Sequence, residues 1–155
     1  MATADDVETY RQHSAELIRY ATVLVGPADA ADVVTDAVLA AFASPSWADV
    51  TNRRAYLYRA VLHESASFHR RAGRRQRRER VAAARDRGIA DPPADTVDAH
   101  RALAALSAQQ RAVVYLTYWE DLTPDRIAAL LGVTEGTVRK QLARARDHLR
   151  RILDA

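Results

Sequence analysis

The segment TPDRIAALLGVTEGTVRKQLAR, residues 123–144, encodes two helices and the turn between them. Thr123 is placed to cap a first helix, and Pro124 occupies the first helical position, where its missing N–H is not needed. Gly132 follows the last apolar residue of that helix and can adopt the left-handed conformation that ends it. Thr134 is a cap for the second helix. This spacing is typical of a helix-turn-helix, which lays its second helix in the major groove of DNA.

The second helix of this segment has an apolar face and a basic face. The apolar residues recur at steps of four and three: Val138, Leu142, Ala145, Leu149 and Ile152. Off this face, Arg139, Lys140 and Arg144 are expected to reach base edges and adjacent phosphates, and Arg150 and Arg151 lie too far along the helix to do so. The backbone N–H groups of Gly136 and Thr137 are expected to face a phosphate. A helical hairpin with a solvated basic face is the alternative interpretation.

The preceding residues favour a three-helix unit. Ser107 and Gln110 form the pattern of a capping box, in which each side chain can bond the backbone N–H of the other. An apolar run from Val113 to Tyr118 follows. The helix-turn-helix is therefore expected to pack on a third helix.

Composition limits the classes of protein that the sequence can encode. The 155 residues, 48% apolar, suffice for one domain or two small ones. With no cysteine, a disulfide framework, a thiolate metal site and a cysteine nucleophile are excluded. The five histidines lack metal-ligand spacing, so we expect neither a metal nor a cofactor. No set of nucleophile, base and orienting group is evident, so no enzyme is indicated.

No apolar stretch approaches the roughly 20 residues of a membrane span, and the first residues are acidic where a signal peptide is basic. We therefore expect a cytoplasmic protein without membrane insertion. The net charge of +3 hides a strong asymmetry along the chain. Residues 1–52 hold two basic and eight acidic residues, and residues 53–87 hold twelve and three. Seven arginines lie between positions 70 and 80, a density that suits a phosphate backbone.

Helical periodicity dominates, and no alternating strand pattern is present, so the fold class is expected to be all-α. Three helices are expected at the start of the chain, over residues 7–24, from 29 to 42, and from 53 into the arginines. Residues 73–98 contain Pro92–Pro93 and few large apolar residues, which predicts a flexible basic linker. The expected organisation is therefore two small helical domains, residues 1–72 and 99–155, joined by that linker.

Three stretches resemble the extracytoplasmic-function (ECF) group of the sigma-70 family. DAADVVTDAVLAAF, residues 29–42, is similar to the region-two helix that docks on the clamp coiled coil of RNA polymerase. RAYLYRAV, residues 54–61, is similar to the start of the family's promoter-reading helix. Leu106 to Leu149 resembles region four almost throughout. The resemblance covers both expected domains in the expected order and leaves the linker unmatched.

The resemblance implies a sigma factor that directs promoter-specific initiation by binding core RNA polymerase and promoter DNA. Residues 1–72 would be region two, which docks on polymerase and reads the minus-ten element, and residues 99–155 would be region four, which reads the minus-thirty-five element. The polymerase-binding residues would be Asp32, Thr35, Asp36 and Leu39. Further DNA-binding residues would be Arg70, Arg71, His63 and Ser67, with Trp47 and Asn52 in a loop that captures a base of the melted strand. Trp47 is at the same time a candidate core residue, because large aromatic side chains are usually buried.

The resemblance implies an anti-sigma factor as a further partner.

The sequence departs from the family pattern at six positions. They are Thr35, Asp36 and Val38 in the docking helix, His63 and Ser67 in the minus-ten helix, and Thr117 before the helix-turn-helix. These departures keep open a second interpretation, a sigma-like helix-turn-helix regulator that does not program polymerase.

Overall fold

The computed structural model describes residues 2–86 and 99–154, and within them every regular element is a helix, which confirms the all-α class. In chain order the elements are α1 (Ala4–Val25), α2 (Ala30–Ala43), the 3₁₀ turn η1 (Trp47–Asp49), α3 (Arg53–Asp86), α4 (Ala99–Ala104), α5 (Ala108–Tyr118), α6 (Pro124–Leu131) and α7 (Glu135–Leu153). No helix among the described residues is both long and apolar enough to cross a membrane.

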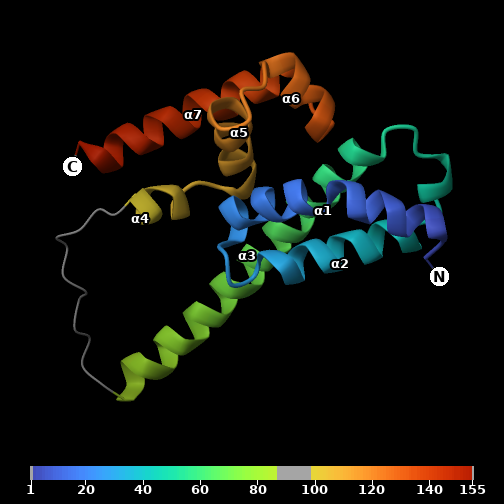
Figure 1. Ribbon diagram of the computed structural model, residues 1–155. Coiled ribbons are helices and arrows are strands. Elements are labelled where there is room, and N and C mark those ends of the chain that lie inside the picture. The colour runs from blue at the N-terminus through green and yellow to red at the C-terminus, as the bar shows by residue number, and fades with distance from the viewer. Residues whose placement is uncertain (1, 87–98, 155) are drawn as a thin grey trace.

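Helices α1, α2 and the first half of α3 form an N-terminal bundle (Figure 1). Leu17, Tyr20 and Leu24 of α1 are fully buried, as their spacing predicts. They pack with Val34 of α2 and Leu57 of α3, because all three helices turn their apolar stripes inward. Gly26, with φ of +89°, ends α1 and allows the chain to reverse into α2.

Helices α5, α6 and α7 form the expected three-helix unit. Ser107 and Gln110 make the capping box of α5, and Thr134 caps α7 by accepting from the N–H of Thr137 at 3.1 Å. Gly132 ends α6 in the left-handed conformation, with φ of +71°. Thr123 lies at the N-cap of α6, but its side chain makes no cap hydrogen bond, contrary to expectation.

The two bundles pack against each other and share one continuous core. Tyr20 of α1 lies between two aromatic partners, Tyr58 of α3 at 4.7 Å and Tyr115 of α5 at 6.2 Å between ring centroids. Arg59 of α3 donates from Nη2 to the carbonyl of Ala129 in the last turn of α6, at 2.9 Å. The carbonyls at a helix C-terminus lack intrahelical partners, so this arginine satisfies a group that α6 leaves open.

Helix α3 is longer than the sequence predicts. The linker was expected to begin at residue 73, but α3 continues without interruption through Gly73 to Asp86. A single glycine costs a helix only about 1 kcal/mol, and the arginines and alanines around it are good helix formers. Residues 87–98, which include Pro92–Pro93, lie outside the described residues. The C-terminal half of α3 extends away from the body of the protein (Figure 1).

Candidate nucleic-acid interface

The recognition helix of the helix-turn-helix, α7, is held by its apolar face. Val138, Leu142 and Ala145 are buried against the rest of the unit, so the opposite face of the helix points to solvent. Since a helix turns by about 100° per residue, Lys140 stands opposite the buried face, and Arg139 and Arg144 flank it. All three side chains are exposed. The structure thus places these three predicted DNA-binding residues on one solvent-facing surface.

Two details of this surface were not foreseen. The Nη2 atom of Arg139 donates to Glu135 Oε1 at 2.6 Å, an exposed ion pair along the helix. The backbone N–H of Thr137 is not free, because the Thr134 hydroxyl caps it. The expectation that Thr137 offers a free N–H to phosphate is therefore wrong: a good N-cap residue fills that position first. Gly136, one residue earlier, is exposed.

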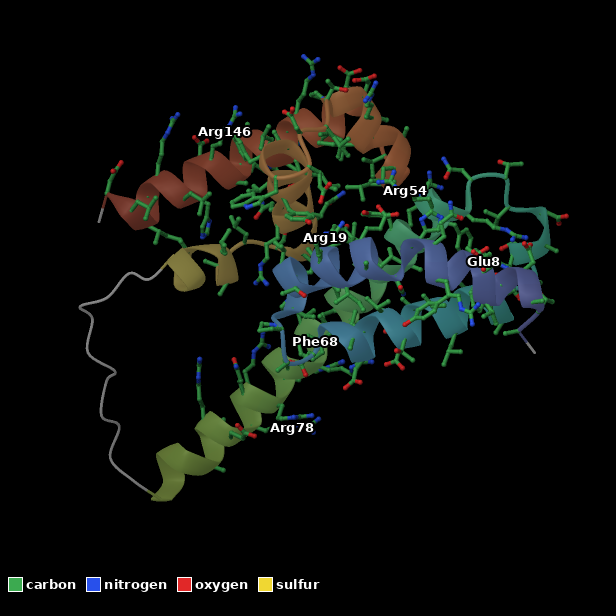
Figure 2. All side chains as sticks on the ribbon, in the orientation of Figure 1. Glu8, Arg19, Arg54, Phe68, Arg78 and Arg146 are labelled. Carbon is green, nitrogen blue, oxygen red and sulfur yellow. The ribbon has the colours of Figure 1, made fainter. Side chains whose placement is uncertain are left out.

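Helix α3 carries a second polar surface. Five residues recur at steps of four and three and so lie on one side of the helix, which we call the α3 stripe: His63, Ser67, Arg70, Arg74 and Arg77. Arg70 Nη2 donates to Ser67 Oγ at 3.0 Å, so the two residues are in contact. Arg71, also a predicted DNA-binding residue, is exposed beside the stripe. Figure 2 shows Arg78 on the same projecting part of α3.

The loop between α2 and α3 is held in place by Trp47. Its side chain is only 5% exposed, packs on Phe42 at 5.1 Å and Tyr56 at 5.5 Å between ring centroids, and donates from Nε1 to Asp6 Oδ1 at 2.8 Å. The prediction that Trp47 is a core residue is confirmed. Asn52 is exposed, and its side-chain oxygen accepts from the backbone N–H of Ala55 at 3.0 Å, at the start of α3.

The charge of Asp6 stabilises this arrangement. The backbone N–H of Thr3 and the indole of Trp47 both donate to its carboxylate, at 2.8 Å each, and these bonds lower the pKa of Asp6 below its ordinary value. Arg53 lies over the Trp47 ring at 5.1 Å and forms an ion pair with Asp5. The N-terminal turn of α1 is thereby connected to the loop and to the start of α3.

The predicted polymerase-binding residues share one face of α2. Asp32, Thr35, Asp36 and Leu39 are all exposed, while the opposite face of the helix is buried in the bundle. Leu39 is 58% exposed, which leaves an apolar side chain uncovered on the same face as the Asp32 and Asp36 carboxylates. The Thr35 hydroxyl donates to the carbonyl of Ala31 at 2.9 Å. These four residues lie on a different helix from both basic surfaces.

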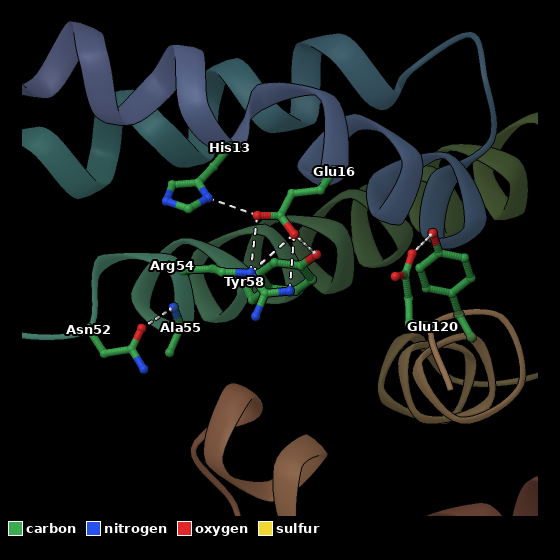
Figure 3. A network of polar contacts seen from close by, with 8 residues as sticks. His13, Glu16, Asn52, Arg54, Ala55, Tyr58 and Glu120 are labelled. Atoms are coloured by element: carbon green, nitrogen blue, oxygen red, sulfur yellow. Dashed lines mark hydrogen bonds and ion pairs between the residues drawn. The ribbon is translucent and has the colours of Figure 1, made fainter. Parts of the chain in front are cut away.

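A polar network that the sequence did not reveal joins α1 to α3 (Figure 3). The Glu16 carboxylate accepts from Arg54 Nε at 3.1 Å and from the Tyr58 hydroxyl at 2.9 Å, and it contacts His13 Nδ1 at 2.8 Å. Burial opposes the charge, but the bonds from Arg54, His13 and Tyr58 prevail and lower the pKa of Glu16. The network fixes the start of α3, the helix that carries the predicted minus-ten residues.

The described residues contain no group of three or more His, Cys, Asp or Glu side chains that could hold a metal ion. The two basic surfaces and the α2 face consist of solvated side chains on rigid helices. Such surfaces can bind phosphate, base edges and a protein partner.

Comparison with known proteins agrees with this geometry. Residues 96–149 match the family model described as Sigma-70, region 4. The chain is 30% identical over 152 residues to an RNA polymerase sigma-E factor of Streptomyces antibioticus, covering 95% of this chain and 83% of that protein. It is 35% identical over 151 residues to the ECF RNA polymerase sigma factor SigL of Mycobacterium tuberculosis, covering 86% of this chain and 80% of that protein.

Two solved structures have a similar fold. The sigma factor RpoE, in complex with the anti-sigma factor NepR from Bartonella quintana, superposes with a TM-score of 0.64 at 25% identity over 99% of both chains. CnrH, in complex with the cytosolic domain of CnrY, gives a TM-score of 0.62 at 25% identity over 96% of this chain and 87% of CnrH. The similarity in sequence and in fold extends over nearly the whole chain, and the chain therefore belongs to the ECF group of sigma-70 family RNA polymerase sigma factors.

Proposed function

We propose that this sigma factor binds core RNA polymerase through the exposed face of α2 and promoter DNA through α7 and the α3 stripe. The observation that carries the proposal is the separation of these surfaces. Asp32, Thr35, Asp36 and Leu39 face solvent on α2, whereas the basic residues lie on α3 and α7. Polymerase and DNA can therefore be held at the same time by different helices.

Helix α7 is suited to the major groove of the minus-thirty-five element. Arg139 and Arg144 carry the planar fork that matches the O6 and N7 acceptors of guanine, and Lys140 supplies a point charge for a phosphate. Gly136 allows close approach of the backbone to DNA at the start of the helix. Region four would correspond to residues 99–155.

Helix α3 is suited to the minus-ten element. His63 and Ser67 are placed to contact bases, and Arg70, Arg71 and the arginines after them follow the phosphate backbone, where each contact adds salt-dependent affinity. Trp47 is buried beneath the loop and anchors it. An unstacked base would therefore bind at the exposed part of the loop, near Asn52. Region two would correspond to residues 1–72, and α3 carries its basic surface on into residues 73–80.

The proposed activity consists of binding and needs no catalytic residues of this chain, so the protein is not an enzyme in its own right. An anti-sigma factor is a proposed regulator, because RpoE in one of the two similar solved structures is in complex with the anti-sigma factor NepR. The proposed site of action is the cytoplasm, where RNA polymerase and promoter DNA are located.

Run-off transcription with purified core polymerase tests the proposal. We expect promoter-dependent product with this protein as the only sigma factor added. Product that requires a second sigma factor would instead identify a sigma-like regulator that does not program polymerase.

A pull-down with core polymerase, without DNA, tests the docking face. Charge reversal by Asp32→Lys with Asp36→Lys should abolish capture of polymerase while helicity is kept. The matched control reverses two exposed acids elsewhere, Glu8→Lys with Asp147→Lys, and should bind as the wild type does. Equal capture by both double variants would show that α2 is not the docking face.

A further inference from the structure

A pocket of about 660 Å³ lies between the two bundles and takes no part in the proposed binding of polymerase or DNA. Its walls come from the end of α1, the middle of α3, α4 and α5, so both bundles line it. The size is within the range of sites for small molecules, which are mostly apolar with a few convergent polar groups.

Arg111 of α5 is the charged residue in this pocket. It is 8% exposed, and its Nη1 and Nη2 atoms donate to the carbonyls of Leu24 at 2.7 Å and Ala104 at 2.9 Å, at the C-terminal ends of α1 and α4. Its Nε–H is buried and has no partner among the described residues. None of the ion pairs between described residues involves Arg111, so no carboxylate there neutralises its charge.

His69 of α3 adds a second donor at the same place. Its Nε2 atom contacts the Leu24 carbonyl and lies 3.3 Å from Arg111 Nη1. The Leu24 carbonyl therefore faces two nitrogen donors from two different helices. Burial lowers the pKa of His69 and the Arg111 guanidinium acts in the same direction, and together they outweigh the contact with the Leu24 carbonyl, which raises it. The excess of donors and the positive charge in this corner belong to Arg111, and an acceptor that carries negative charge would balance them.

The remaining walls are mostly apolar, with Thr22 and Gln76 among them. Val23 and Val25 of α1, Leu103 of α4 and Val114 of α5 all line the pocket, and Trp119 lines it with 70% of its surface exposed. A tryptophan left so open beside an apolar pocket is available to cover a ligand.

We propose that this pocket is a binding site for a small amphiphilic acid, whose carboxylate accepts from Arg111 and whose apolar body lies along Val23, Val25 and Val114 beneath Trp119. Such a ligand touches both bundles, so its binding stabilises their packed arrangement. The proposal goes beyond the sigma-factor activity and does not depend on it.

Decanoate, used below the concentration at which it aggregates, is the test ligand, and decanol is its uncharged counterpart. Isothermal titration calorimetry on the full chain should show saturable 1:1 binding of decanoate, at least about tenfold tighter than decanol, since the carboxylate meets a buried guanidinium. Trp119 fluorescence should change on binding, whereas Trp47, which is buried elsewhere, should not respond. Absence of saturable binding, or equal affinity for decanoate and decanol, would overturn the proposal.

Variants locate the site. Arg111→Gln should weaken decanoate binding at least about tenfold and leave decanol binding unchanged. The matched control is Arg59→Gln, which also removes an arginine that joins the two bundles but lies outside the pocket, and it should bind decanoate as the wild type does. Equal affinity of Arg111→Gln and wild type would refute the assignment. If Arg111→Gln does not fold, Arg111→Lys replaces it, and the comparison of decanoate with decanol on the wild type still decides.

Discussion

Replacement of Gly132 by alanine tests whether the two bundles pack in solution as they do in the structure. Gly132 has φ of +71° and ends α6. A Cβ atom added there would lie 2.5 Å from Arg59 Nε and 2.8 Å from Arg59 Cζ. The guanidinium would have to move, and its bond to the Ala129 carbonyl would be lost. The substitution therefore disturbs one backbone conformation and one contact between the bundles.

The two effects can be separated in magnitude. A left-handed alanine costs about 1–2 kcal/mol in any background. Loss of the exposed hydrogen bond from Arg59 adds about 0.5–1.5 kcal/mol, but only where Arg59 is present. We expect Gly132→Ala to lower the free energy of unfolding by about 2 kcal/mol in the wild type and by about 1 kcal/mol in an Arg59→Ala background. The coupling between the two sites is then about 1 kcal/mol, above the roughly 0.3–0.5 kcal/mol within which independent sites add.

Urea denaturation of the two single variants, the double variant and the wild type, followed by far-UV circular dichroism, measures the cycle. Gly73→Ala is the matched control, because Gly73 lies inside α3 with nothing within 4 Å of an added Cβ. That change should stabilise the protein by about 1 kcal/mol in both backgrounds. If Gly132→Ala costs the same with and without Arg59, the contact between α3 and α6 is absent in solution and the packing argument fails.

Three further outcomes are expected. In binding assays across a salt series, Arg139→Ala should lower the binding free energy for the promoter by about 1–3 kcal/mol and relax sequence preference. Lys140→Ala should weaken binding of promoter and scrambled DNA alike and lower the salt slope by about one. An effect from Arg150→Ala alone would contradict this assignment. Because the pKa of Glu16 is lowered, its contribution to stability is fully present above pH 4.5, the ordinary pKa, and is lost as the pH falls through the lowered pKa. Glu16→Gln should therefore flatten the decline in unfolding free energy in acid. An unchanged pH profile would exclude Glu16 as the cause. Trp47→Phe should lower the midpoint of thermal unfolding by about 2–4 °C through loss of the bond to the N-terminal turn, and an unchanged midpoint would show that the loop is not anchored there.

The sequence predicted best those features that depend on neighbouring residues. The capping box of Ser107 and Gln110, the left-handed Gly132 and the Thr134 cap each involve residues at most four positions apart, so their chemistry is visible in the sequence. The apolar stripe of α7 followed for the same reason. Even here one local prediction is wrong, because the N–H of Thr137, expected to face a phosphate, already bonds the Thr134 hydroxyl.

Contacts between distant residues could not be predicted in the same way. Trp47 and Asp6 are 41 positions apart, and Arg111 and the Leu24 carbonyl are 87 positions apart. A single sequence can indicate which residues are buried, but it does not indicate which distant residues they contact. Arg111 follows Gln109 and Gln110 at the polar start of α5, so only the structure shows that it is buried. A charge at such a position implies a nearby partner without naming it.

The length of α3 has a consequence for the proposed binding of DNA by the α3 stripe. From His63 to Arg77 the α3 stripe rises about 21 Å, at 1.5 Å per residue, within a single uninterrupted helix. The number of residues between the candidate base-reading residues and the arginines therefore sets both their separation along the helix axis and the angle between them around it. One alanine inserted after Ser67 would advance the arginines by 1.5 Å but rotate them by about 100° around the axis. With three or four inserted alanines the rotation nearly completes one turn, and the arginines return to almost the same side of the helix as His63 and Ser67. Affinity for DNA should therefore vary with the period of a helical turn and not with helix length alone.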